Sequence, residues 1–367
     1  MDTHDDNDDL DPGYQPRDSD SDTRNAEAPL VRDPVPSPNE HPPTPPDIDL
    51  PTISYFHHFI TITIFTLPIF SQSRSTAGYW QATITPQALH HKWLLHGLLA
   101  ISACHMATGA DTQDLSKTHR SRAESFSASF FTGWEAIQST SESGIHIPSS
   151  NNLQHEAASQ VAGILSCALH ENQQLSSTMN HLRGITTSCA APYSSNSHNY
   201  GPHCPAPSTF AEASRILNSQ ISSSPSQTTN NHPNPTAEIQ QTLTTLPQRM
   251  ARVFSRPSHS TEVLTVLAAI AALIKCCETS FDVNKPNAAW HGMMAWLFNI
   301  PEQFFEMVTR NSAPAIVVVA HWAAFLVKRA EGSGWWFLKG LAGGILRQVW
   351  DRIEVEAVRE LVAGLMP

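Results

Sequence analysis

The segment WLLHGLLAISACHMA, residues 93–107, decides the fold class of this chain. Large apolar residues recur in it at helical spacing, and they occupy two neighbouring faces of the helix that this spacing predicts. The residues on these two faces are Leu94, Leu98 and Ile101, and Leu95, Leu99 and Met106. Because the helix is apolar around most of its circumference, we expect it to lie inside a domain.

The remaining face of this helix carries the small residues Gly97, Ala100, Cys104 and Ala107. A line of small side chains allows a second helix to pack closely against the first. Such packing offsets the poor helix propensity of Gly97.

Residues on either side of the segment predict where the helix begins and ends. Thr85 is placed to cap the free N–H groups, and Pro86 stands in the first turn, where a proline loses no hydrogen bond. Gly109 predicts the end of the helix.

Helical periodicity continues along most of the chain, and no hairpin signals intervene. The alternation Thr61-Ile62-Thr63-Ile64 also fits a strand, and propensity does not decide between the two. The other expected helices are 53–60, 116–137, 153–169, 236–254, 260–277, 288–298, 301–310, 314–329, 335–350 and 354–365. We therefore predict an all-α fold, an irregular multi-helix domain with little or no sheet.

The acidic charge of the chain is concentrated at its start. Residues 1–50 hold 14 acidic side chains and 3 arginines, a net charge of −11 that equals the formal net charge of the whole chain. This segment is rich in Pro and Ser and poor in aromatic residues, so it cannot bury enough apolar surface to offset the entropy of ordering. We predict a disordered acidic tail over 1–51 and an all-α domain over 52–367, with a polar, disordered insertion over about 172–235.

The rest of the composition argues against several functions. Residues 51–367 contain 19 acidic and 19 basic side chains, whereas a domain that binds nucleic acid needs a local excess of Lys and Arg. The six cysteines are scattered and the histidines lack the spacing of metal ligands, so we expect no metal site. Phosphate loops and nucleophile motifs are absent, so no catalytic residue and no cofactor is predicted.

The uncharged stretch PAIVVVAHWAAFLV, residues 314–327, is close to the lower length limit of a membrane span. The polar His321 in its middle and Pro314 at its start favour a core helix instead. No membrane span is predicted.

His321 and the aromatic residues near it are the candidate functional residues. One interpretation is a core histidine that bonds to a backbone carbonyl among packed aromatic rings. The other is an apolar pocket between helices in which one polar group orients a ligand. The residues of this predicted pocket are His321, Trp322, Phe325, Trp335 and Trp336.

Several segments, taken in order, resemble the regulatory domain of fungal zinc-cluster transcription factors of the sterol uptake control type. They are Trp80-Gln81 followed by Pro86, residues 94–107, Leu182-Arg183-Gly184, residues 314–323 and residues 335–342. The resemblance implies an all-α effector domain that controls transcription and, in some relatives, binds a sterol in a pocket of the C-terminal helices. Only Ala320-His321-Trp322 and Trp335-Trp336 match positions that belong to such a pocket.

The resemblance also implies partners and a location. The family's N-terminal zinc cluster and basic linker have no counterpart here, where an acidic tail stands instead. We therefore expect a nuclear regulator that acts through a DNA-binding partner or as a homo-oligomer, with the cytoplasm as the other possible location. The alternatives are a module that senses an apolar, sterol-like molecule or binds proteins without a role at promoters, and an all-α enzyme.

Overall fold

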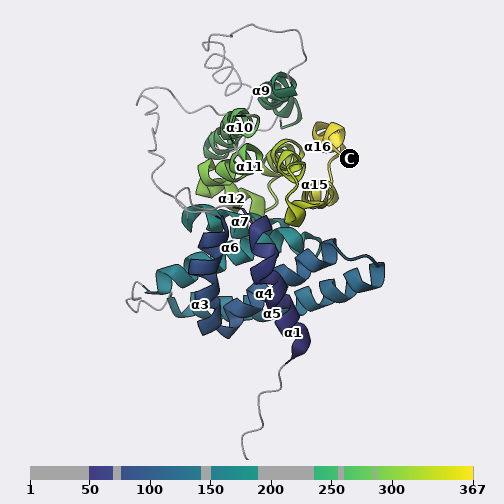
Figure 1. The fold of residues 1–367 in the computed structure, drawn as a ribbon. Helices are drawn as coiled ribbons and strands as arrows, with labels where there is room; N and C mark the ends of the chain where they lie inside the picture. The colour runs from purple at the N-terminus through teal and green to yellow at the C-terminus, as the bar shows by residue number, and fades with distance from the viewer. Residues whose placement is uncertain are drawn as a thin grey trace, which may run out of the picture. The chain divides into compact units, whose positions relative to one another are not determined.

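A computed structural model describes residues 49–68, 76–141, 150–188, 235–254, 260–282, 284–285 and 287–366. Every regular element within these ranges is helical, which confirms the predicted all-α fold (Figure 1). The predicted tail lies outside the described ranges, apart from its last residues.

The first half of the domain contains α1 to α7, joined by short 3₁₀ and π turns labelled η. Their bounds are α1 Leu50–Thr61, η1 Thr63–Thr66, α2 Thr76–Tyr79, η2 Trp80–Ile84, α3 Thr85–His90, α4 Lys92–Thr108, α5 Gln113–Ser141, α6 Ser150–Ala168, η3 His170–Asn172 and α7 Leu175–Ser188. The undecided segment at residues 61–64 therefore ends a helix and begins a 3₁₀ turn.

The second half contains α9 to α16. Their bounds are α9 Pro235–Val253, α10 Ser260–Ser280, α11 Ala288–Asn299, α12 Glu302–Thr309, α13 Ala313–Trp322, η4 Ala323–Val327, α14 Lys328–Glu331, η5 Trp336–Leu338, α15 Leu341–Arg352, α16 Glu356–Val362 and η6 Ala363–Leu365. Except at residues 335–350, these helices follow the predicted segments closely, because those segments carry a periodic apolar face.

Helix α4 is the central element of the first half and packs against α1, α3, α5 and α6. Gly97 marks the closest approach, because a Cβ atom there would lie 2.5 Å from Val161 Cγ1 and 2.7 Å from Phe130 Cδ2. The predicted role of the small-residue face is thus confirmed at this position. The two partners come from α6 and α5, so one glycine serves two helix contacts.

Helix α13 occupies the equivalent position in the second half. It contacts α10, α15 and α16, and all its side chains from Ala315 to Trp322 are buried. Helix α7 joins the two halves, since it packs against α6 on one side and α11 on the other (Figure 1). Its Arg183 also forms an ion pair with Glu302 of α12.

The start of the central helix differs from the prediction. Thr85 and Pro86 open the short helix α3 instead, and the backbone at His91 is extended, with φ −129° and ψ 103°, before α4 begins. Thr85 does not cap a helix, because its hydroxyl donates to the Trp80 carbonyl within the π turn η2 at 2.9 Å. Gly109 ends α4 as predicted.

The predicted insertion also starts too early in the sequence. Helix α7 covers residues 175–188, and its apolar residues Leu175, Met179, Leu182 and Ile185 are buried at helical spacing. The high polar content of the segment hid this apolar stripe. Residues 189–234 of the predicted insertion lie outside the described residues, and Pro235 begins α9.

Residues 335–350 do not form the single helix that was predicted. Gly340 adopts a left-handed backbone, with φ +82°, and separates the 3₁₀ turn η5 from α15. Its amide donates to the Glu331 carboxylate. Glycine adopts this conformation without the strain that a side chain causes, which explains why residue 340 is a glycine between η5 and α15.

Two helical stretches, Ser260–Ser280 and Ala313–Glu331, are long and apolar enough to cross a membrane by length and composition alone. The core helices of globular proteins meet the same criterion. In this fold, 50% of the most apolar window of the first stretch and 67% of that of the second are buried. The second stretch begins with the buried helix α13, in agreement with the core helix predicted at 314–327.

A substitution at Gly97 tests the close approach of α4 to its neighbours. Gly97→Val should lower the free energy of unfolding by about 1–3 kcal/mol, because the new side chain overpacks the contact with Phe130 and Val161. Urea unfolding followed by circular dichroism measures the change.

Gly343→Ala is the matched control, since a Cβ at residue 343 of α15 meets no atom within 4 Å. Alanine should raise the free energy of unfolding there by roughly 0.5–1 kcal/mol through helix propensity. Equal effects at the two glycines would contradict the packing argument.

Candidate functional site

His321 lies in the centre of the second half and is fully buried. Its Nδ1 is 2.8 Å from the Val317 carbonyl oxygen. Because a carbonyl only accepts, Nδ1 carries the proton and Nε2 is left as an acceptor. Nε2 is buried without a hydrogen-bond partner among the described residues. Burial lowers the pKa of His321 to about 4, so the ring is neutral at physiological pH.

The neighbours of His321 are closely packed aromatic rings. Trp322 is fully buried and stacks on Trp296, with ring centroids 5.1 Å apart. Phe325 meets the His321 ring edge-on at 5.9 Å. The bond to Val317 and this packing are those expected of a core histidine.

Trp335 and Trp336, the last two residues of the predicted pocket, contact different parts of the domain. Trp335 packs against Trp290 and Phe337 inside the second half. Trp336 reaches the first half, where it stacks on His105 with ring centroids 4.8 Å apart and donates from Nε1 to Thr66 Oγ1 at 2.9 Å. The five predicted residues therefore do not line one space, and the apolar-ligand pocket stays a prediction.

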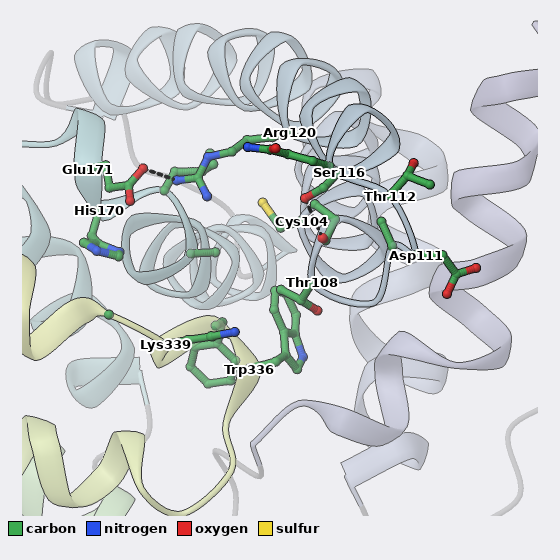
Figure 2. Close-up of a pocket in the computed structure, with 17 residues that line it drawn as sticks. Cys104, Thr108, Asp111, Thr112, Ser116, Arg120, His170, Glu171, Trp336 and Lys339 are labelled. Carbon is green, nitrogen blue, oxygen red and sulfur yellow. Dashed lines mark hydrogen bonds and ion pairs between the residues drawn. The ribbon is translucent and has the colours of Figure 1, made fainter.

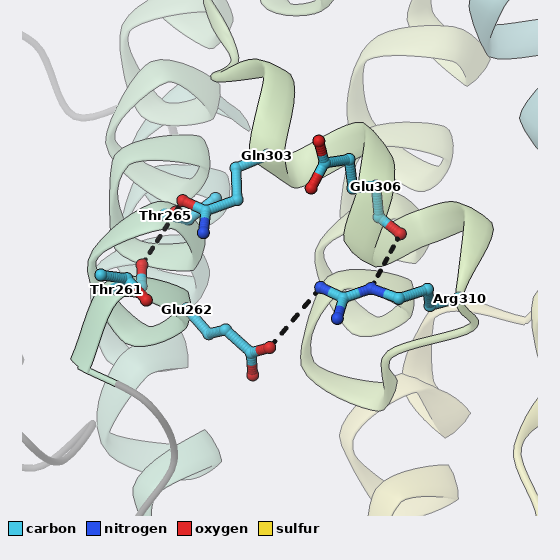
Figure 3. Close-up of polar contacts among 6 residues, drawn as sticks. All are labelled: Thr261, Glu262, Thr265, Gln303, Glu306 and Arg310. Carbon is cyan, nitrogen blue, oxygen red and sulfur yellow. Dashed lines mark hydrogen bonds and ion pairs between the residues drawn. The ribbon is translucent and has the colours of Figure 1, made fainter.

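Trp336 does line a cavity of about 590 Å³, which we call the α4–η5 cavity (Figure 2). Three stretches remote from one another in the sequence form its wall: the end of α4 with the start of α5, the end of α6 with η3, and η5 with the turn that follows. Its lining residues are Cys104, Ala107, Thr108, Ala110, Asp111, Thr112, Gln113, Ser116, Arg120, Ala168, Leu169, His170, Glu171, Trp336, Phe337, Lys339 and Gly340. Its volume is in the range of small-molecule sites.

The charged groups of this cavity are only partly paired. Arg120 donates to Glu171 across 2.8 Å, which joins α5 to η3. Lys339 is exposed and forms no ion pair with a described residue. Figure 2 shows Arg120 and Lys339 on opposite sides of the cavity, whereas Asp111 is turned away from it.

His170 forms a wall of the cavity and is held by its own neighbours. Its Nδ1 lies 2.9 Å from the Cys167 carbonyl oxygen, so Nδ1 donates and Nε2 is an acceptor. Gly344 of α15 leaves the space for this ring, because a Cβ there would lie 2.5 Å from His170 Cδ2. Apart from Trp336, sequence reasoning missed the residues of this cavity, since no motif joins three remote stretches.

The described thiols show no sign of reactivity. Cys104, Cys276 and Cys277 are buried and free, and burial raises the pKa of each to about 12. A thiolate is the reactive form, so these groups are inert at physiological pH. Within the described ranges, no cluster of three or more His, Cys, Asp or Glu side chains could hold a metal ion.

Comparison with known proteins connects the first half of the fold to a family. Residues 54–127 match the fungal specific transcription factor domain. The matched residues run from α1 into α5 and include all of α4. The broad resemblance predicted from the sequence is thus confirmed for this segment, while the sterol uptake control type stays a prediction.

A longer similarity covers both halves. The chain is 37% identical over 322 residues to the orsellinic acid/F9775 biosynthesis cluster protein D of Emericella nidulans. The alignment includes 84% of this chain and 59% of the relative, so the chain spans less than two thirds of that protein's length. No solved structure matches the chain.

The neutral state of His321 predicts how stability depends on pH. The pKa of His321 is about 4 in the folded protein, below its usual value of 6.5, so the unfolded chain binds a proton first as the pH falls. Neutral His321 makes its full contribution to the free energy of unfolding above pH 6.5. As the pH falls from about 6.5 to 4, this contribution decreases by roughly 3 kcal/mol in total. Urea unfolding across this range measures the slope.

His321→Leu should flatten that slope, because the variant has no group to protonate at this position. His57→Gln is the control, since His57 is exposed on α1. The same slope in His321→Leu as in the unmodified chain would show that other groups cause the pH dependence.

Proposed function

We propose that this chain is a transcriptional regulator that acts in the nucleus as an all-α effector domain and not as an enzyme. The observation that carries the proposal is the match of residues 54–127 to the fungal specific transcription factor domain. The buried helix at residues 93–107, from which the fold class was predicted, lies inside this match.

The proposal assigns DNA contact to a partner protein that has its own DNA-binding domain. Its support is the charge of residues 51–367, which carry 19 acidic and 19 basic side chains. The basic groups are also spread out: Arg120 pairs with Glu171, and Arg249 donates to the Leu361 carbonyl oxygen at 3.2 Å. A surface of this kind supplies little of the phosphate attraction that DNA binding requires.

The finer resemblance, to regulators of the sterol uptake control type, is part of the proposal. It rests on the order of the resembling segments along the chain, and the sterol-like ligand that it implies is assigned only to Ala320-His321-Trp322 and Trp335-Trp336. The similarity to a biosynthesis cluster protein supports a role in regulating a set of biosynthetic genes.

Chromatin immunoprecipitation of the full chain, combined with transcript profiling of a deletion strain, tests the regulatory function. We expect enrichment at a limited set of promoters and altered transcripts of the adjacent genes. Tethering the chain to an unrelated DNA-binding domain should change expression of a reporter with the matching operator. Unchanged transcripts, no promoter enrichment and an inert tethered chain would together contradict the proposal.

A further inference from the structure

We propose that the α4–η5 cavity binds a small hydroxylated aromatic carboxylate. The inference rests on the lining of the cavity and does not depend on the proposed regulatory function. The volume of about 590 Å³ exceeds the space that a two-ring molecule needs, and it lies within the range of about 300–1,000 Å³ typical of ligand sites.

The aromatic wall of the cavity is held in place before any ligand arrives. Trp336 is fixed by its stack on His105 and by the 2.9 Å hydrogen bond from Nε1 to Thr66 Oγ1. Phe337 meets the Trp336 ring edge-on at 5.6 Å. A rigid pair of rings favours a flat aromatic ligand, because little side-chain entropy is lost on binding.

The cations of the cavity favour a negative charge on that ligand. Glu171 neutralises Arg120 but occupies only part of its guanidinium, which has five N–H donors. Lys339 has no ionic partner among the residues that the structure describes, and Asp111 is turned away (Figure 2). A ligand carboxylate beside Lys339 would give this lysine the ionic partner that it lacks, through charge-assisted hydrogen bonds.

The neutral polar groups favour hydroxyl donors on the ligand. Thr108 donates its proton to the His105 carbonyl at 2.7 Å, and Ser116 donates to the Ala107 carbonyl at 2.8 Å. Both hydroxyl oxygens are therefore left as acceptors.

A wholly apolar ligand fits this lining poorly. A sterol skeleton would displace water from Arg120, Lys339 and the acceptors without replacing the hydrogen bonds, and unpaired polar groups are costly to bury. The cavity is therefore distinct in chemistry from the apolar pocket predicted around His321.

Isothermal titration calorimetry of the full chain with 6-hydroxy-2-naphthoate and its methyl ester tests the charge requirement. The acid should bind at least tenfold more tightly than the ester. Lys339→Gln should remove most of this difference, because the exposed lysine supplies the free cation. Lys275→Gln, an exposed lysine of α10 outside the cavity, is the matched control and should bind as the unmodified chain does.

A second variant tests the hydroxyl acceptor at Thr108. Thr108→Val has the same shape but no hydroxyl, so it should weaken binding of 6-hydroxy-2-naphthoate about tenfold and leave binding of 2-naphthoate unchanged. Circular dichroism verifies that each variant is folded. The inference is overturned if the unmodified chain shows no binding at millimolar acid, if acid and ester bind equally, if Lys339→Gln has no effect, or if ergosterol binds and the acid does not.

Discussion

The close contact of α4 with α5 and α6 at Gly97 is the constraint on which the first half of the domain depends. A side chain at this position would collide with Phe130 and Val161, so the helices can meet only where Cβ is missing. The same contact sets the position of the C-terminal end of α4. That end carries Cys104 and Thr108 into the wall of the α4–η5 cavity, so a packing contact decides where the cavity can form.

Two neutral histidines occupy important packing positions in the domain, one at the contact between its halves and one inside the second half. His105 lies under Trp336 of the second half, and burial together with the neighbouring His58 lowers its pKa to about 4. His321 is neutral for the same main reason, its burial. A charged imidazole at either place would have to be desolvated without a counter-ion, which is expensive. Both sites therefore favour the neutral imidazole.

Helices with strong apolar periodicity were predicted correctly from the sequence, whereas a helix with weak periodicity was missed. Helices α4, α10 and α13 have large buried faces, so their residues alone indicated a buried helix. Helix α7 has only a narrow apolar stripe within a polar segment, and it was predicted to be part of a disordered insertion. Gly340 was assigned to a helix because glycine spacing does not reveal a left-handed backbone.

The sequence by itself determined the all-α class, the burial of residues 93–107 and the neutral balance of charge beyond the acidic N-terminal segment, because these properties depend on residue type and local spacing. Only the tertiary structure decided which residues share a cavity. Arg120, His170 and Lys339 are separated by about fifty residues or more, and no local sequence pattern indicates that they line the same cavity. The helix pairings that bring them together follow from shape complementarity between whole faces, a non-local property that a single sequence does not display.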